Sequence, residues 1–218
     1  MSQVWKSFWP ILERLEAEVC ELSFALAYSD DHLRVYSSRL ADLLLRACAE
    51  CENVGKALCL DKGLVASGTS VNRFNFRAVG DAICSRIAIH TKVLSIIWPY
   101  QSFTATDITP FNTWQPAGST NPAWFDAYNG VKHDRIGNAK NASVENVIHA
   151  LAGLFVLNLW LREREITGIS EHIDLARRRI VSYSQFFSAA QFLKLESRDG
   201  MSGPMSGGSL RSLVFHWA

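Results

Sequence analysis

The residues best suited to chemistry lie in one short segment, WFDAYNGVKHDR. Lys132, His133 and Arg135 can each donate hydrogen bonds to a phosphate, and the imidazole of His133 can also transfer protons near neutral pH. On a helix, Asn129 and His133 are four residues apart and share one face, while Tyr128 lies beside Lys132. This pattern favours a site for an anion or for the backbone of RNA.

The same side chains also have a structural explanation. Tyr128, Asn129 and His133 could form a hydrogen-bonded corner that holds a short helix against the protein, with Lys132 and Arg135 merely solvated. Several polar groups beside aromatic anchors are, however, more than a surface turn requires. The residues alone leave both interpretations open.

Other sequence signatures of chemistry are few. The chain has no phosphate-binding loop and no GxGxxG, GxSxG or HExxH motif, which excludes the enzyme classes defined by those motifs. Cys48 and Cys51 form a CxxC pair, but no second pair follows at the spacing of a zinc site. We therefore expect no metal and no cofactor, and reduced cysteines at core positions.

Charge and hydropathy limit the location of the protein and its partners. The 22 Lys and Arg residues are balanced by 21 Asp and Glu residues, so a nucleic-acid site must be local. Acidic residues interrupt the apolar pattern near the N-terminus, which is unlike a secretory signal. The longest apolar run, residues 147–161, is shorter than the roughly 20 residues that span a bilayer. We expect a soluble, cytoplasmic protein that does not contact a membrane.

The elements that must position the polar segment are helices. Apolar residues recur at three- and four-residue steps along most of the chain. This spacing predicts helices over residues 4–27, 33–59, 74–89, 123–133, 144–166 and 170–195. The helix over 144–166 is apolar on nearly every side and is expected at the centre. An all-α, antiparallel helical bundle is the simplest fold for such elements.

One stretch breaks the helical pattern. Residues 91–122 combine β-favouring side chains with several prolines, which predicts an irregular insertion with a short β-hairpin. We expect a single helical domain over residues 1–196 and a Gly- and Ser-rich tail over 197–218. The apolar residues 213–217 in that tail could dock back onto the core.

Particular residues mark the expected helix boundaries. Pro10 either begins or bends the first helix. Asn121 is the expected cap of the helix over 123–133, and Asn141 or Ser143 is the expected cap of the central helix.

The polar segment and the Ala-rich helix that follows it resemble a group of uncharacterised bacterial proteins, which in turn resemble the HEPN superfamily of all-α domains. In its nuclease members a helix carries Arg, a polar residue that is often Asn, three variable residues and His. Asn129 and His133 match the latter part of this pattern. Tyr128 stands where the pattern has Arg, and Arg135 on the far side of His133 is the candidate replacement.

The resemblance implies a HEPN-like homodimer that binds nucleotide or RNA, in a bacterial defence or stress setting. As a metal-independent ribonuclease, it would use His133, Asn129 and Arg135 as catalytic residues, with His133 as acid or base. Lys132, Arg135 and Tyr128 would bind the RNA phosphate. The alternative is a non-catalytic helical module for an unidentified protein partner, in which residues 128–135 are structural.

Overall fold

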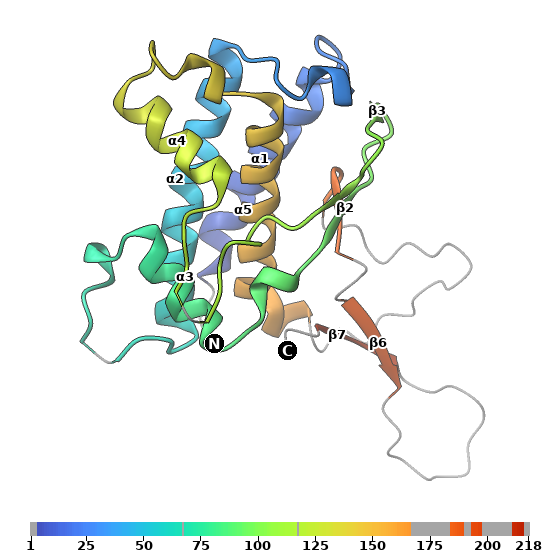
Figure 1. Cartoon of the computed structure of the whole chain (residues 1–218). Helices are drawn as coiled ribbons and strands as arrows, with labels where there is room; N and C mark the ends of the chain where they lie inside the picture. Colours follow the sequence, from blue (N-terminus) through green and yellow to red (C-terminus); the bar gives the residue numbers. More distant parts are fainter. Residues whose placement is uncertain are drawn as a thin grey trace, which may run out of the picture.

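The computed structural model describes residues 4–66, 68–116, 118–166, 184–189, 193–197 and 211–215. Within these residues the protein is predominantly helical (Figure 1). The α-helices are α1 (Trp5–Leu22), α2 (Ser38–Asp61), α3 (Phe76–Cys84), α4 (Ala123–His133) and α5 (Val144–Ile166). Short 3-10 helices lie at Asp30–His32, Val71–Arg73, Ile89–Thr91 and Ala139–Asn141.

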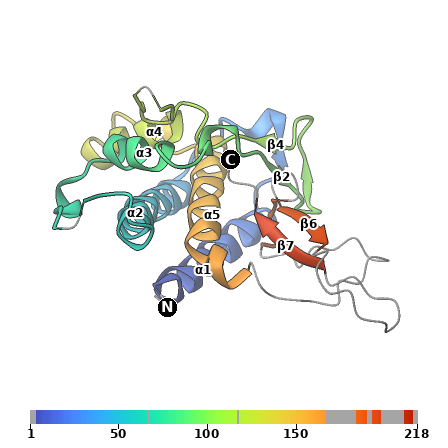
Figure 2. The same ribbon diagram turned by 90° about the horizontal axis from the view of Figure 1, so that it is seen from below.

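The most apolar helix, α5, lies at the centre as its sequence predicts. It packs against α1, α2 and α4, and Figure 2 shows it between α2 and the strands. By length and composition Val144–Arg162 could also cross a membrane, but 83% of that window is buried inside the protein. Such burial is typical of the core helix of a soluble protein.

The two longest helices, α2 and α5, run in the same direction. Their beginnings are joined by a backbone bridge between Tyr36 and Ser143. Toward their ends, the ammonium of Lys62 lies 6.0 Å from the centre of the Trp160 ring. Figure 1 shows both helices running the same way, side by side.

Two further helices run against this pair. The guanidinium of Arg162, near the end of α5, lies 4.4 Å from the ring centre of Trp5 at the beginning of α1. Just after the end of α4, Arg135 donates a hydrogen bond to the carbonyl of Ser38, where α2 begins. The described helices therefore include parallel and antiparallel neighbours, whereas the sequence led us to expect an antiparallel bundle.

Helices α1 and α2 are joined by one buried carboxylate. Glu18 accepts hydrogen bonds from Arg14 at 2.9 Å, Arg39 at 2.8 Å and Arg46 at 2.6 Å. These bonds, that of Arg46 first, lower the pKa of Glu18 below its ordinary value even though burial opposes the shift. The cluster links α1 to α2, and the buried charge of Glu18 is satisfied by three guanidinium groups.

The boundaries of several helices differ from the expected ones. Helix α1 begins at Trp5 and continues through Pro10, so the proline does not start it. Helix α3 is shorter than residues 74–89, because Asn75 caps its first turn and a 3-10 turn at Ile89–Thr91 follows its end. At the beginning of α5, the expected Ser143 cap is present and accepts from the backbone N–H of Asn146 at 3.3 Å.

Short strands occupy the expected insertion. Strand β2 (Leu94–Ile96) pairs antiparallel with β4 (Asp107–Ile108) in the stretch where a short hairpin was expected, although another strand lies between them in the sequence. Strand β5 (Phe187–Ser188) pairs with the other edge of β2. A separate pair is formed by β1 (Tyr28–Ser29) and β3 (Gln101–Ser102), which run parallel.

The prediction of a last helix over residues 170–195 is wrong wherever the structure describes these residues. Strand β5 and strand β6 (Leu193–Ser197) lie where that helix was expected, and the remainder falls outside the described residues. The physical reason lies in α1: the buried carboxylate of Glu16 accepts from the backbone N–H groups of Gln185 and Phe186, at 3.1 and 3.3 Å. These groups are therefore not available to a helix. Strand β7 (Arg211–Phe215), in the expected tail, pairs antiparallel with β6.

Candidate functional site

Helix α4 holds the polar segment on a rigid aromatic base. Phe125 stacks on Phe76 of α3 with ring centres 4.0 Å apart. Trp124 donates a hydrogen bond of 2.8 Å to the carbonyl of Pro110, and it packs closely against Gly153 of α5, where a Cβ would lie 3.0 Å from the indole. Buried aromatic contacts of this kind fix the orientation of a short helix. The polar end of α4 is therefore held in one place.

The beginning of α4 is fixed by a different residue from the expected one. Pro122, not Asn121, occupies the N-cap position, and its backbone is extended there. The amide of Asn121 instead donates to the carboxylate of Asp126 at 2.8 Å. Proline suits the entrance of a helix because it has no N–H to leave unpaired.

Tyr128 is buried and lies against Lys132. Its side chain is only 4% exposed, and the ammonium of Lys132 lies 5.1 Å from the centre of its ring. Burial raises the pKa of Tyr128, while its hydrogen bond with Lys132 acts in the opposite direction. The same hydrogen bond is the main cause of a raised pKa at Lys132, and the charge of Glu52 on α2 adds to it. Tyr128 thus orients the lysine and offers no open surface to an RNA phosphate.

The remaining candidate residues lie on the surface. Lys132, His133 and Arg135 are exposed, and Asn129 is half-buried one turn before His133. Arg135 touches the backbone of Ser38 at 3.4 Å. Within the described part of the chain, His133 and Asn129 have no hydrogen bond to each other or to another side chain. The three side chains are exposed in and just after the last turn of α4, and no described hydrogen bond orients the imidazole.

Hydrogen bonds of Asp and Asn side chains fix the loop that follows α4. The carboxylate of Asp134 accepts from the backbone N–H of Gly137 at 2.9 Å, and Asn138 donates to the carbonyl of Asp134 at 3.1 Å. Asn141 then donates to Asn138 at 3.2 Å, and Asn146 donates to the carbonyl of Asn141 at 2.8 Å. Side chains that satisfy loop carbonyls in this way hold the loop in a defined shape.

Two exposed side chains extend this surface. Ile136, in the loop, is 93% exposed. Tyr36 is 55% exposed and is joined to the loop region by its bridge to Ser143. The three asparagines after Asp134 (Asn138, Asn141 and Asn146) were a sequence signal for the loop, but no sequence signal connects Tyr36 with Arg135. The tertiary fold alone brings them near each other.

The buried cysteines have structural positions. Cys48 and Cys51 are fully buried, and burial raises the pKa of both thiols well above the usual range, so they remain protonated. The thiol of Cys51 lies 3.6 Å from the carbonyl of Ala150, which fixes it against α5. Among the described residues, no three His, Cys, Asp or Glu side chains are grouped so as to hold a metal ion.

The comparisons with known proteins do not add a family to this geometry. No protein-family model matches the chain, and no curated protein or solved structure is significantly similar to it. Its function has to be argued from the site.

Proposed function

We propose that the protein binds the phosphate backbone of RNA, or a nucleotide, at the end of α4. The observation that carries this proposal is the state of Lys132, His133 and Arg135: all three are exposed on a rigid base, and none forms an ion pair within the described residues. Unpaired cations in a fixed arrangement are what a phosphate backbone attracts. The neighbouring carboxylate of Asp134 is held by the loop backbone.

An aromatic ring beside these cations would also suit RNA. Tyr36 is exposed, and the Arg135 guanidinium touches Ser38 two residues further along the chain. Exposed tyrosine rings provide stacking surfaces for unpaired bases, while lysine and arginine hold the phosphates. Single-stranded RNA is therefore the preferred ligand in this proposal.

Cleavage of RNA is the further step that the HEPN resemblance suggests. His133 would transfer protons as acid or base, Asn129 would assist from the same face, and Arg135 or Lys132 would stabilise charge on the phosphate. No described side chain in the same protomer orients the His133 ring. A metal-independent ribonuclease of this kind would therefore need a homodimer, in which a second copy completes the site.

A protein partner is the second candidate for the same surface. Its support is Ile136, which exposes almost its whole side chain on a loop that hydrogen bonds hold in shape. An ordered, protruding apolar residue is a typical anchor for an interface. In this case residues 128–135 have a structural role and the module is non-catalytic.

Binding and cleavage are tested with a labelled pool of single-stranded RNA. Fluorescence anisotropy is measured for the wild type and for the double variant Lys132→Ala/Arg135→Ala, with Arg86→Ala as the control because Arg86 is an equally exposed arginine next to α3. We expect the double variant to bind about tenfold more weakly, and the control to bind as the wild type does. Equal binding by all three proteins would refute the RNA site.

Cleavage is read on a gel in the presence of a chelator. We expect products with the wild type and none with His133→Ala, and light scattering should give the mass of a dimer. RNA binding without cleavage in the wild type would leave a binding protein. If neither occurs, the protein-partner candidate is tested by comparing the proteins captured by the wild type with those captured by Ile136→Asp. We expect the variant to lose the partner.

A further inference from the structure

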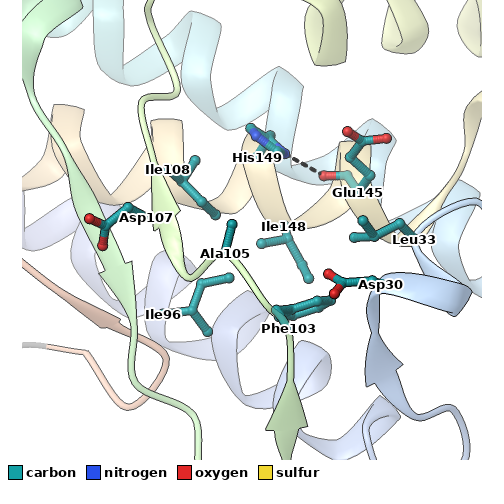
Figure 3. Close-up of a pocket in the computed structure, with 10 residues that line it drawn as sticks. All are labelled: Asp30, Leu33, Ile96, Phe103, Ala105, Asp107, Ile108, Glu145, Ile148 and His149. Carbon is teal, nitrogen blue, oxygen red and sulfur yellow. Dashed lines mark hydrogen bonds between the residues drawn. The ribbon is translucent and has the colours of Figure 1, made fainter.

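A pocket is lined by residues of the first turns of α5 and of β2 and β4. Strand β2 lies on the side of α5 away from α4 (Figure 1). The volume of the pocket is about 190 Å³. An enclosed cavity of about 150 Å³ can hold a benzene molecule, so there is room here for one ring or a short branched alkyl group. The apolar lining is formed by Leu33, Ile96, Phe103, Ala105, Ile108 and Ile148. Figure 3 shows most of these side chains gathered around one space.

The Asp and Glu side chains of the described lining give this pocket a negative charge. Asp30, Asp107 and Glu145 line the pocket, and neither Lys nor Arg is among its described lining residues. Asp30 is fixed beside Phe103, because its carboxylate accepts from the backbone N–H and the hydroxyl of Thr104. This carboxylate is therefore held in place before any ligand arrives.

The other two carboxylates differ in whether a hydrogen bond holds them. Asp107 accepts a 2.7 Å hydrogen bond from the hydroxyl of Ser95, and Figure 3 shows its carboxyl group directed away from the apolar side chains. Glu145 is exposed, and its carboxylate has no hydrogen-bond partner within the described chain. Glu145 can thus turn toward a cation at the mouth of the pocket.

The one other polar side chain of the lining is an acceptor as well. Nδ1 of His149 lies 2.9 Å from the backbone carbonyl oxygen of Glu145, and only a protonated nitrogen can donate to a carbonyl. In the neutral ring, Nε2 is then left as an acceptor. With His149 neutral, each polar side chain in the described lining has an atom that can accept a hydrogen bond from a ligand.

We propose that this pocket binds a small organic cation, a protonated amine that carries one ring or a short branched alkyl group. The apolar part of the ligand fills the space between Ile96, Phe103 and Ile148, from which it displaces water. The ammonium group faces Asp30 and Glu145 and donates its hydrogen bonds there. A neutral analogue lacks this attraction, and an anionic analogue is repelled. The site is independent of the RNA surface on α4.

The test uses benzylamine as the probe, with benzyl alcohol and benzoate as neutral and anionic analogues of the same shape. Binding is measured by isothermal titration calorimetry and located by NMR shifts of the Ile96, Ile108 and Ile148 methyl groups. We expect benzylamine to bind at these methyl groups and benzyl alcohol to bind more weakly, and we expect no binding of benzoate. Absence of benzylamine binding, or equal affinity for benzyl alcohol, would overturn the proposal.

Two variants test separately the charge of Glu145 and the volume of the pocket. Glu145→Gln keeps the shape of the side chain but removes its charge. We expect it to weaken benzylamine binding about two- to fivefold, the effect of losing an exposed ion pair. Glu21→Gln, an exposed glutamate on α1, is the matched control and should have no effect. Ala105→Leu should narrow the pocket and weaken binding about tenfold. If benzylamine binds Glu145→Gln and the wild type equally, a specific cation site is excluded even where Ala105→Leu proves unstable.

Discussion

The protein places its cations in two contrasting environments. Between α1 and α2, Arg14, Arg39 and Arg46 all donate to the buried carboxylate of Glu18. At the end of α4, Lys132 and Arg135 are equally cationic but have no ion-pair partner within the described residues. The first group holds two helices together, and the second is free to bind an anion. Partners and burial, not residue type, decide which cations are available.

This contrast also explains why the composition was uninformative about the site. A net charge of +1 counts the arginines that are bound to Glu18 together with cations that form no ion pair within the described residues. A total charge therefore does not show which cations have an acidic partner. The following predictions test whether the two groups differ as described, beginning with the largest effect.

Glu18→Ala should have the largest effect. The substitution leaves Arg46 and Arg39 without their buried acceptor, and hydrogen bonds to charged groups contribute about 1.5–3 kcal/mol, so we expect the free energy of unfolding to fall by about 2 kcal/mol. Urea denaturation measures the change. Glu21→Ala, three residues further along the same helix but exposed, is the control and should be nearly neutral. Equal stability of the two variants would show that the arginine cluster does not hold α1 to α2.

The salt dependence of RNA binding should separate the two groups of cations. Each phosphate contact adds about 0.7 to the slope of log affinity against log salt for single strands, so Lys132→Ala/Arg135→Ala should reduce that slope by about 1.4. Arg39→Ala should leave the slope unchanged, because this arginine is committed to Glu18. Anisotropy titrations at several salt concentrations provide the measurement. A reduced slope in Arg39→Ala would place RNA at the α1–α2 contact instead.

Acid should weaken the α1–α2 contact before the rest of the core. The pKa of Glu18 is lowered in the folded protein, chiefly by its hydrogen bond with Arg46. Its contribution to stability is therefore complete above the unfolded pKa and is lost as the pH falls through the folded pKa. Glu18→Gln should flatten the loss of stability below the ordinary glutamate value of 4.5. Thermal unfolding between pH 7 and pH 3 measures the profile. If Glu18→Gln loses stability with pH as the wild type does, Glu18 is not the group responsible.

Tyr128→Phe should give the smallest effect. It removes the hydroxyl that accepts from Lys132 but keeps the buried ring, so we expect a loss of stability of about 1 kcal/mol or less. The pKa of Lys132 should fall toward its ordinary value, because the hydrogen bond to Tyr128 is the main cause of its rise. NMR titration of the lysine ammonium group measures this. RNA binding weakened as much as in Lys132→Ala would instead give Tyr128 a direct part in binding.

Most of the helical framework could be predicted from the sequence. The bounds of α4 and α5 agree with the expected residues 123–133 and 144–166, because apolar side chains at helical spacing define the face that must be buried. The Ser143 cap and short strands in the stretch of β2 and β4 were also predicted, since both depend on local residue preferences.

The candidate site was predicted only by residue type. The sequence identified Lys132, His133 and Arg135 as chemically capable, but it could not show that Tyr128 is buried beneath the lysine. Nor could it place Tyr36 beside this surface, because that proximity depends on the parallel contact of α2 with α5. The pocket likewise depends on three segments, residues 30–33, 96–108 and 145–149, that are far apart in the sequence.

The sequence by itself determined the presence of the helices α1 to α5, the apolar character of α5 and the position of the polar segment at the end of α4, because these depend on neighbours three or four residues away. The tertiary structure decided the direction of α2 relative to α5, the strands near residue 187 and the pairing of each charge. The buried carboxylates of Glu16 and Glu18 illustrate the reason. They differ by two positions on one helix, yet one binds the backbone of residues 185 and 186 and the other binds three arginines, because each charge must find its partner wherever the fold brings one within reach.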